Sequence, residues 1–318
     1  MTMNEWFVLG VDLGSTTAKA AVVDSGGALA GSSVVQMGAV SREAVGRAID
    51  AALATAGVAR SAIRRTISTG YGRKLVPGVD RSFTEITCHA RGAAAMRPGV
   101  RLVIDIGGQD SKAILVDDDG LVDRFAMNDR CASGTGRFFD VLARALEVDV
   151  ADVGALALRG TDTLEVSSMC ATFAETEVIS MLAQGQDKAD IAASVHKAVA
   201  ARTLGLVAQV GKATPTVMTG GVAKNPAALE HISRLLRQPV EQLDEPQIAG
   251  AYGAGLLARD DVAGSAGLPH VADAATADDF ARHKSAGVPH CAACDGNLDH
   301  AHGASGEPVP LDLQRNIR

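Results

Sequence analysis

One short segment occurs twice in this chain, and the repeat limits the possible folds more than any other feature. Residues 11–20 read VDLGSTTAKA and residues 104–113 read IDIGGQDSKA, so Asp12 corresponds to Asp105, 93 positions later. Each copy predicts an apolar strand, a tight glycine turn, a second apolar strand and an Asp/Gly hairpin turn. Two copies of this plan predict two similar lobes.

The glycine turns have the residue types of phosphate-binding turns. A strand that ends in Asp and turns through Gly presents backbone N–H groups and small hydroxyls to phosphate oxygens. The carboxylate at the strand end can hold Mg²⁺ through water and orient an attacking water molecule. We therefore predict that Asp12 and Asp105 are catalytic residues for ATP hydrolysis, with ATP and Mg²⁺ bound between the lobes. The alternative is a pair of ordinary β-hairpins, which the duplication and a later turn at Gly220 and Gly221 make less favourable.

Charge and hydropathy exclude several classes of function. The net charge is -7, which argues against nucleic acid as a partner because phosphate backbones require a basic face. The chain has no long apolar run of membrane-spanning length, and its N-terminus lacks the pattern of a secretory signal. We therefore expect no membrane partner and a cytoplasmic location. Neither a P-loop motif nor a strand followed by G-x-G-x-x-G is present, which disfavours P-loop and Rossmann sites.

Apolar spacing and composition predict the remaining organisation. We expect a first lobe at residues 1–100, a second lobe at 101–261 and a partly disordered tail at 262–318, which is rich in Ala, Gly, His and Pro. The final helix, near residues 247–258, is expected to pack back on the first lobe. Helices are predicted between Ser41 and Gly57, from Phe138 to Leu146, from about Cys170 to Leu182, from Asp187 through Val210, and after Asn225.

The cysteines do not indicate a disulfide framework, because there are five of them in a long chain. Cys131 and Cys170 lie at or just before predicted helix N-termini, where the helix dipole lowers a thiol pKa and stabilises an anionic cluster. A [4Fe–4S] cluster needs four thiolates, which two chains around a twofold axis would supply. From their positions alone, the favoured interpretation is that Cys131 and Cys170 are small buried apolar side chains and not cluster ligands. Cys291 and Cys294 have the spacing of half a metal site, and incidental cysteines in a flexible tail are the favoured alternative.

Both copies of the repeat, together with MTGGV at residues 218–222, resemble the two phosphate motifs and the adenosine motif of the acetate and sugar kinase/Hsp70/actin superfamily. The resemblance implies an α/β fold of two ribonuclease-H-like, actin-like lobes, with the nucleotide in the cleft between them. The residues expected to contact the nucleotide are Gly14, Ser15, Thr16, Thr17, Lys19, Gly107, Gly108, Gln109, Gly134, Thr135, Gly136, Gly220, Gly221 and Gln247.

A narrower resemblance covers about residues 6–258. NDRCASGTGRF around Cys131, within the matching segment 105–177, resembles the BadF/BadG/BcrA/BcrD-type ATPases, as do TGYGR at 69–73 and EITCHA at 85–90. These ATPases comprise activators of 2-hydroxyacyl-CoA dehydratases and ATPase subunits of benzoyl-CoA reductases. The resemblance implies that Cys131 and Cys170 hold a [4Fe–4S] cluster shared between two identical or homologous subunits. Cys88 lies in a family motif and is expected to be a packing residue or a residue of the contact between the lobes.

The same resemblance implies that ATP hydrolysis drives an electron from a low-potential donor, such as ferredoxin or flavodoxin, to a partner CoA-thioester reductase or dehydratase. Because the tail extends beyond the usual end of the family pattern, our leading interpretation is an ATPase subunit of benzoyl-CoA reductase. The alternative is a homodimeric activator of a 2-hydroxyacyl-CoA dehydratase. Other classes are a small-metabolite kinase, for which no acceptor-facing Asp is evident, and a chaperone-like switch, for which no peptide-binding domain remains.

Overall fold

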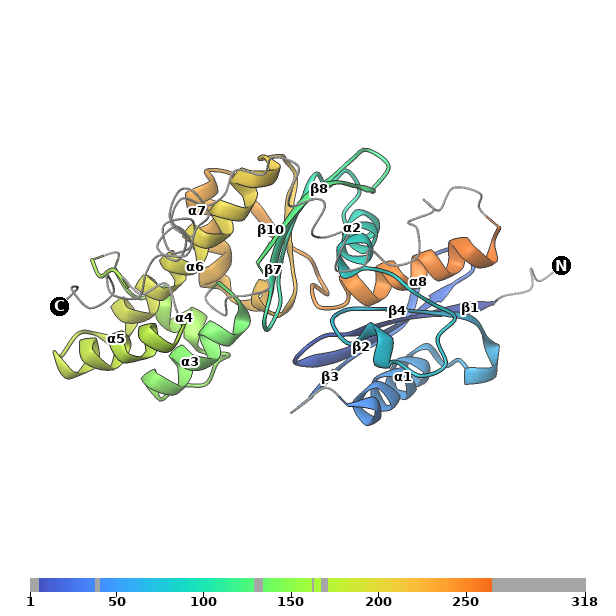
Figure 1. Ribbon diagram of the computed structural model, residues 1–318, viewed down its shortest axis with the longest axis horizontal. Helices are drawn as coiled ribbons and strands as arrows, with labels where there is room; N and C mark the ends of the chain where they lie inside the picture. The colour runs from blue at the N-terminus through green and yellow to red at the C-terminus, as the bar shows by residue number, and fades with distance from the viewer. Residues whose placement is uncertain (1–5, 38–40, 129–133, 162, 167–170, 265–318) are drawn as a thin grey trace, which may run out of the picture. The chain divides into compact units, whose positions relative to one another are not determined.

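The computed structural model (Figure 1) describes residues 6–37, 41–128, 134–161, 163–166 and 171–264. Two five-stranded sheets organise these residues, with the strand orders β3-β2-β1-β4-β5 and β10-β9-β6-β7-β8. Each sheet has antiparallel pairs on one side of its first strand and parallel pairs on the other. The fold is therefore α/β with one plan used twice, as the sequence predicts.

The first sheet has both of its faces buried. Its strands are β1 (Phe7–Leu13), β2 (Thr17–Asp24), β3 (Leu29–Gln36), β4 (Ile63–Thr69) and β5 (Arg81–Ser82). Successive side chains of a strand point to opposite faces, so Leu9 and Val11 pack with α1 (Arg42–Ala56), whereas Val8 packs with α8 (Ala249–Val262). Figure 1 shows α1 and α8 on opposite faces of this sheet.

The second sheet repeats this arrangement with a larger insertion. Its strands are β6 (Leu102–Ile106), β7 (Ser111–Val116), β8 (Val122–Asn128), β9 (Thr216–Thr219) and β10 (Val240–Gln242). The helices between β8 and β9 are α3 (Gly136–Leu146), α4 (Val153–Ala157), α5 (Ala171–Ala183) and α6 (Lys188–Val210). In the first lobe the corresponding connection contains α1 and the short turn η1 (Arg60–Ala62).

The core of the second lobe forms where α3 and α6 cover the apolar face of the second sheet. By length and composition alone, α6 could cross a membrane, but 61% of its most apolar window is buried inside the protein. This burial is typical of a core helix. The Asp187 side chain caps α6, and Asn225 caps α7 (Pro226–Leu236), as predicted.

The helices α2 (Glu85–Met96) and α8 pack against each other with very close backbones. A Cβ atom at Gly92 would overlap the carbonyl of Ala249, and one at Gly253 would overlap the carbonyl of Cys88. These two contacts are reciprocal, so a local twofold relates the helices. Of the two, α2 contacts strands of the second sheet and α8 contacts strands of the first.

The last helix differs from its predicted bounds of residues 247–258. It begins at Ala249 because the preceding turn is held by a hydrogen bond from the Gly220 N–H to the Pro246 carbonyl, at 3.0 Å. It continues to Val262 because Asp260 and Asp261, on its last turn, make ion pairs with arginines of α2, β4 and β5.

Candidate functional site

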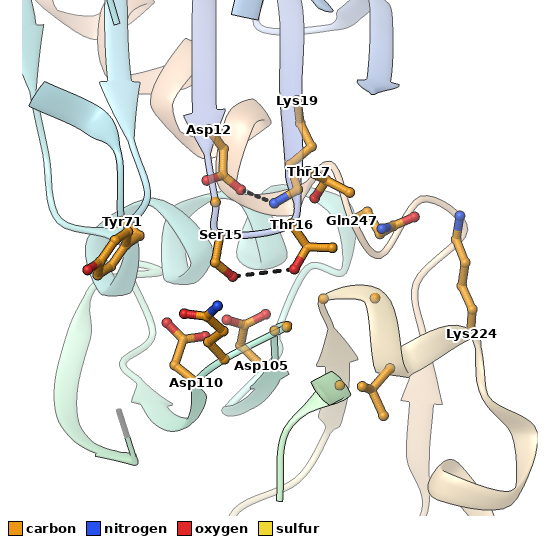
Figure 2. Close-up of a pocket in the computed structure, with 18 of the residues that line it drawn as sticks. Asp12, Ser15, Thr16, Thr17, Lys19, Tyr71, Asp105, Asp110, Lys224 and Gln247 are labelled. Atoms are coloured by element: carbon orange, nitrogen blue, oxygen red, sulfur yellow. Dashed lines mark hydrogen bonds and ion pairs between the residues drawn. The ribbon is translucent and has the colours of Figure 1, made fainter. Parts of the chain in front are cut away.

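A cavity of about 570 Å³ lies where the two glycine turns face each other. The residues predicted from sequence that line it are Asp12, Gly14, Ser15, Thr16, Thr17, Lys19, Asp105, Gly107, Gly108, Gln109, Gly136, Gly220, Gly221 and Gln247. In Figure 2, Asp12, Ser15 and Thr16 lie opposite Asp105 and Asp110. The turns are in contact, since a Cβ atom at Gly108 would overlap the Thr16 hydroxyl.

The first turn joins β1 to β2 and contains one ion pair, formed by one carboxylate and one lysine. Asp12 is the buried penultimate residue of β1, and Lys19 lies directly opposite it in the antiparallel ladder. The Lys19 Nζ atom is 2.9 Å from Asp12 Oδ2. The turn itself is closed by a hydrogen bond of 3.1 Å from the Gly14 N–H to the Thr17 carbonyl. One carboxylate therefore faces one ammonium group in this half of the cavity.

The second turn has the same geometry and more negative charge. Lys112 is only 1% exposed, and its Nζ atom lies 3.1 Å from Asp105 Oδ2 and 2.9 Å from Asp110 Oδ1. A third carboxylate, Glu85 of α2, is 3.6 Å from the same ammonium. Burial alone would lower the pKa of Lys112, but the three carboxylates raise it above its usual value. Burial raises the pKa of Glu85, against the attraction of Lys112.

Asp105 is the most tightly held carboxylate of the cavity. Its Oδ1 atom accepts a hydrogen bond from the Thr219 hydroxyl at 3.0 Å and lies 3.4 Å from His89 Nδ1. Burial opposes ionisation of this group, but His89 and Lys112 hold the pKa of Asp105 well below its ordinary range. The side chain is therefore an anion at neutral pH, fixed from three directions.

Each lobe also has a Thr-Gly pair at the end of the parallel strand beside its aspartate. Thr69 pairs with Asp12 in the strand register, and Thr219 pairs with Asp105. The glycines that follow, Gly70 and Gly220, have φ angles of 89° and 84°. A Cβ atom at either one would crowd the neighbouring aspartate carboxylate, so both positions require glycine for conformation and for space.

The sequence comparison at constant offset missed this second part of the repeat. The Thr-Gly pairs are 150 positions apart, whereas the aspartates are 93 apart, because α3 to α6 lengthen the second lobe. Aligning the two lobes separately would have found it. Other lining residues that were not predicted are Gln36, Tyr71, Glu85, His89, Asp110, Lys112, Met127, Phe139, Asp140, Val150, Ala151, Val222, Lys224 and Asn225.

The predicted adenosine side of the cavity is formed by η3 (Gly221–Lys224) and the turn before α8. Lys224 and Gln247 lie on this side in Figure 2, away from the paired aspartates. A Cβ atom at Gly221 would come 3.5 Å from Gln247 Nε2, which is an ordinary contact, so Gly221 and Gln247 are neighbours in this wall of the cavity.

Gly134 and Thr135 do not line the cavity, in contrast to Gly136. Thr135 is fully buried and precedes α3. The Gly136 N–H donates to the Gly107 carbonyl at 2.8 Å, and the Arg137 N–H donates to the Gly108 carbonyl at 2.9 Å. The N-terminus of α3 is therefore attached directly to the second turn.

The predicted cluster ligands, Cys131 and Cys170, lie outside the described residues, as do Cys291 and Cys294. Within the described ranges, no group of three or more His, Cys, Asp or Glu residues is arranged to hold a metal ion. Cys88 is fully buried on α2, and burial raises the pKa of its thiol to about 12. This thiol is protonated at neutral pH, which agrees with a packing role.

Comparison with known proteins gives a consistent result. A model of the BadF/BadG/BcrA/BcrD ATPase family matches residues 9–258. The chain is 42% identical over 252 residues to the activator of lactoyl-CoA dehydratase from Anaerotignum propionicum, covering 79% of this chain and 97% of that protein. It is 34% identical over 210 residues to a benzoyl-CoA reductase subunit from Thauera aromatica, covering 64% of this chain and 74% of that protein.

The structural comparison agrees with the sequence comparison. The activator of the 2-hydroxyisocaproyl-CoA dehydratase from Clostridium difficile, solved with bound ADPNP, is 37% identical and has a TM-score of 0.77. That match covers 81% of this chain and 96% of the solved one. The two lobes are thus those of an actin-like ATPase, with a relative that binds an ATP analogue. The chain belongs to the BadF/BadG/BcrA/BcrD ATPase family.

Proposed function

We propose that this chain is the ATP-hydrolysing activator of a 2-hydroxyacyl-CoA dehydratase and works as a homodimer. The dehydratase activator from Anaerotignum propionicum is matched over nearly its whole length at 42% identity, whereas the benzoyl-CoA reductase protein from Thauera aromatica is matched at 34% over 74% of its length. The tail, on which the reductase interpretation rests, lies beyond the matched residues 9–258. The relatives therefore favour the activator, the alternative interpretation of the sequence.

The cavity suits a magnesium nucleotide. The turn N–H groups and the hydroxyls of Ser15 and Thr16 are donors for phosphate oxygens, and Lys19 adds a cation on the same side. Asp12 and Asp105 are buried carboxylates, and these hard oxygen donors fit Mg²⁺ held through water. When bound, Mg²⁺ would neutralise charge on the phosphates. Both aspartates would orient water against the terminal phosphate.

The observation that carries coupling to electron transfer is the attachment of α3 to the second turn. Gly107 and Gly108 contact the cavity, and their carbonyls accept hydrogen bonds from the first residues of α3. Cys131 lies five residues before α3 begins. A nucleotide that moves the second turn would therefore move the segment that contains Cys131.

We assign Cys131 and Cys170 of two subunits as the four ligands of one [4Fe–4S] cluster, which would supply one-electron chemistry. The electron would come from a low-potential donor such as ferredoxin or flavodoxin, and would pass to the dehydratase component that binds the CoA thioester. The role of this chain is to hold the cluster and to change its surroundings when ATP binds and is hydrolysed.

The test is anaerobic purification of the full chain, followed by iron analysis and measurement of oligomeric state. Cys131→Ser and Cys170→Ser should each lose iron and weaken dimerisation, because the cluster joins the subunits. A variant with Cys291→Ser and Cys294→Ser is the matched control and should keep its iron. The wild type should then switch on a 2-hydroxyacyl-CoA dehydratase only with ATP and a reductant. Full iron in the Cys131→Ser, Cys170→Ser double variant, or activation without ATP, would contradict the proposal.

A further inference from the structure

His89 is a buried histidine inside the cavity that the proposed chemistry has not yet used. It is 6% exposed and extends from α2 toward the second lobe. Its Nδ1 atom lies 3.1 Å from the Thr219 hydroxyl, whose hydrogen is donated to Asp105 Oδ1. Because a hydroxyl has one hydrogen, Nδ1 must be the donor in its contact with Thr219. His89 therefore donates a hydrogen bond to Thr219, and Thr219 donates one to Asp105.

The other ring nitrogen of His89, Nε2, lies close to Gly250 of α8. A Cβ atom at Gly250 would lie 2.8 Å from His89 Nε2 and 3.1 Å from Asp12 Oδ2. Both side chains therefore lie near Gly250, but among the described residues His89 forms its hydrogen bond and ion pair with Thr219 and Asp105. The ring thus reaches Asp105 of the second lobe and packs beside Gly250 of α8.

The local twofold of α2 and α8 explains why there is space for this ring. The reciprocal contacts relate Cys88 to Ala249, so the next residues, His89 and Gly250, occupy equivalent positions. A side chain at both positions would collide on the axis. The chain has an imidazole at one of them and only a hydrogen atom at the other.

We propose that His89 is a positioning residue for ATP hydrolysis, which fixes the Asp105 carboxylate directly and through Thr219, and that Gly250 is required to leave room for its ring. The inference rests on the proposed function, because it assumes that Asp105 serves hydrolysis. Removing the ring should impair the chemical step and leave nucleotide binding nearly intact.

The experiment measures kcat and KM for MgATP hydrolysis by the full-length dimer. His89→Ala should lower kcat about 10–100-fold, the usual effect of losing a partner that orients a ligand, with KM within about threefold. His89→Asn, whose amide can still donate to Thr219, should keep several-fold more kcat than His89→Ala. Gly250→Ala should also lower kcat, because its Cβ displaces the ring.

The double variant separates this mechanism from general damage. If Gly250→Ala acts through His89, adding it to His89→Ala should lower kcat no further. Gly46→Ala is the matched control, because that helical glycine has no atom within 4 Å of the added Cβ and should keep kcat. His231→Asn, a histidine of the same 6% exposure outside the cavity, is the second control.

The outcomes distinguish this inference from the proposed function. Asp105→Ala is the reference, and if it leaves kcat unchanged, the proposed function fails. If Asp105→Ala lowers kcat while His89→Ala and Gly250→Ala do not, only the His89 inference is overturned. The inference is also overturned if the fold-losses of kcat caused by His89→Ala and Gly250→Ala multiply in the double variant. A rise in KM as large as the fall in kcat would overturn it as well.

Discussion

The two lysines of the repeat provide a direct test of the charge arrangement in the cavity. Lys112 is paired with three carboxylates, whereas Lys19 is paired with one, although the two residues are equivalent in the repeat. Methionine keeps most of the shape of lysine and removes its charge. We therefore compare Lys112→Met with Lys19→Met in the absence of nucleotide.

The expected loss of stability follows from what each substitution leaves behind. Removing one partner of a buried ion pair costs about 3–5 kcal/mol, because an uncompensated charge stays buried. Lys112→Met leaves the buried Asp105 unpaired together with Asp110 and Glu85, which are each about a fifth exposed and partly screened, so the upper end, about 5 kcal/mol, applies to it. Lys19→Met leaves the single buried carboxylate of Asp12 without its partner, so the lower end, about 3 kcal/mol, applies to it.

Differential scanning calorimetry measures both effects as shifts in Tm. At about 2–4 °C per kcal/mol for a protein of this size, Lys112→Met should lower Tm by about 10–20 °C and Lys19→Met by about 6–12 °C. Adding Glu85→Gln and Asp110→Asn to Lys112→Met should restore part of the lost Tm, because fewer buried charges are left without a partner. Equal losses for the two lysines, or no recovery in the combined variant, would refute this account of the cavity.

Two further changes have defined outcomes. Burial raises the pKa of Glu85 from an ordinary value near 4.5, so the folded state binds its proton more tightly and loses stability as pH rises above that value. Glu85→Gln should therefore raise Tm near pH 7, and the gain should vanish near pH 4; a gain that persists at low pH would contradict the charge argument. Truncation after Gly264 should leave MgATP affinity within about threefold by calorimetric titration, because the whole cavity precedes it, whereas a large loss would place the tail against the nucleotide.

The sequence was sufficient for features that depend on near neighbours. Ser41 and Asn225 are followed by apolar residues at helical spacing, and each accepts the hydrogen bond that such a cap predicts. The glycine turns could be predicted for the same reason, because a strand, a turn and a strand are contiguous in each copy. The predicted fold class and most of the predicted cavity residues therefore agree with the structure.

Features that depend on the packing of distant segments could not be predicted. Glu85 and His89 are one helical turn apart on α2, but which lobe they face is decided by the contact of α2 with α8, whose residues are more than 150 positions away. The role of Gly250 in particular has no local signal. The position of Gly134 and Thr135 next to Gly136 predicts contact with the nucleotide, but Thr135 is fully buried. Neither residue lines the cavity.

The two copies of the repeat differ in the number of carboxylates that surround their lysine. The first turn has one carboxylate for one lysine, and the second has three around Lys112. A bound phosphate adds negative charge and Mg²⁺ removes it, so the energy of the second turn depends more strongly on what the cavity contains. That turn is also the one whose carbonyls hold the N-terminus of α3. The turn that is most sensitive to the nucleotide is therefore the one attached to α3, which begins five residues after Cys131.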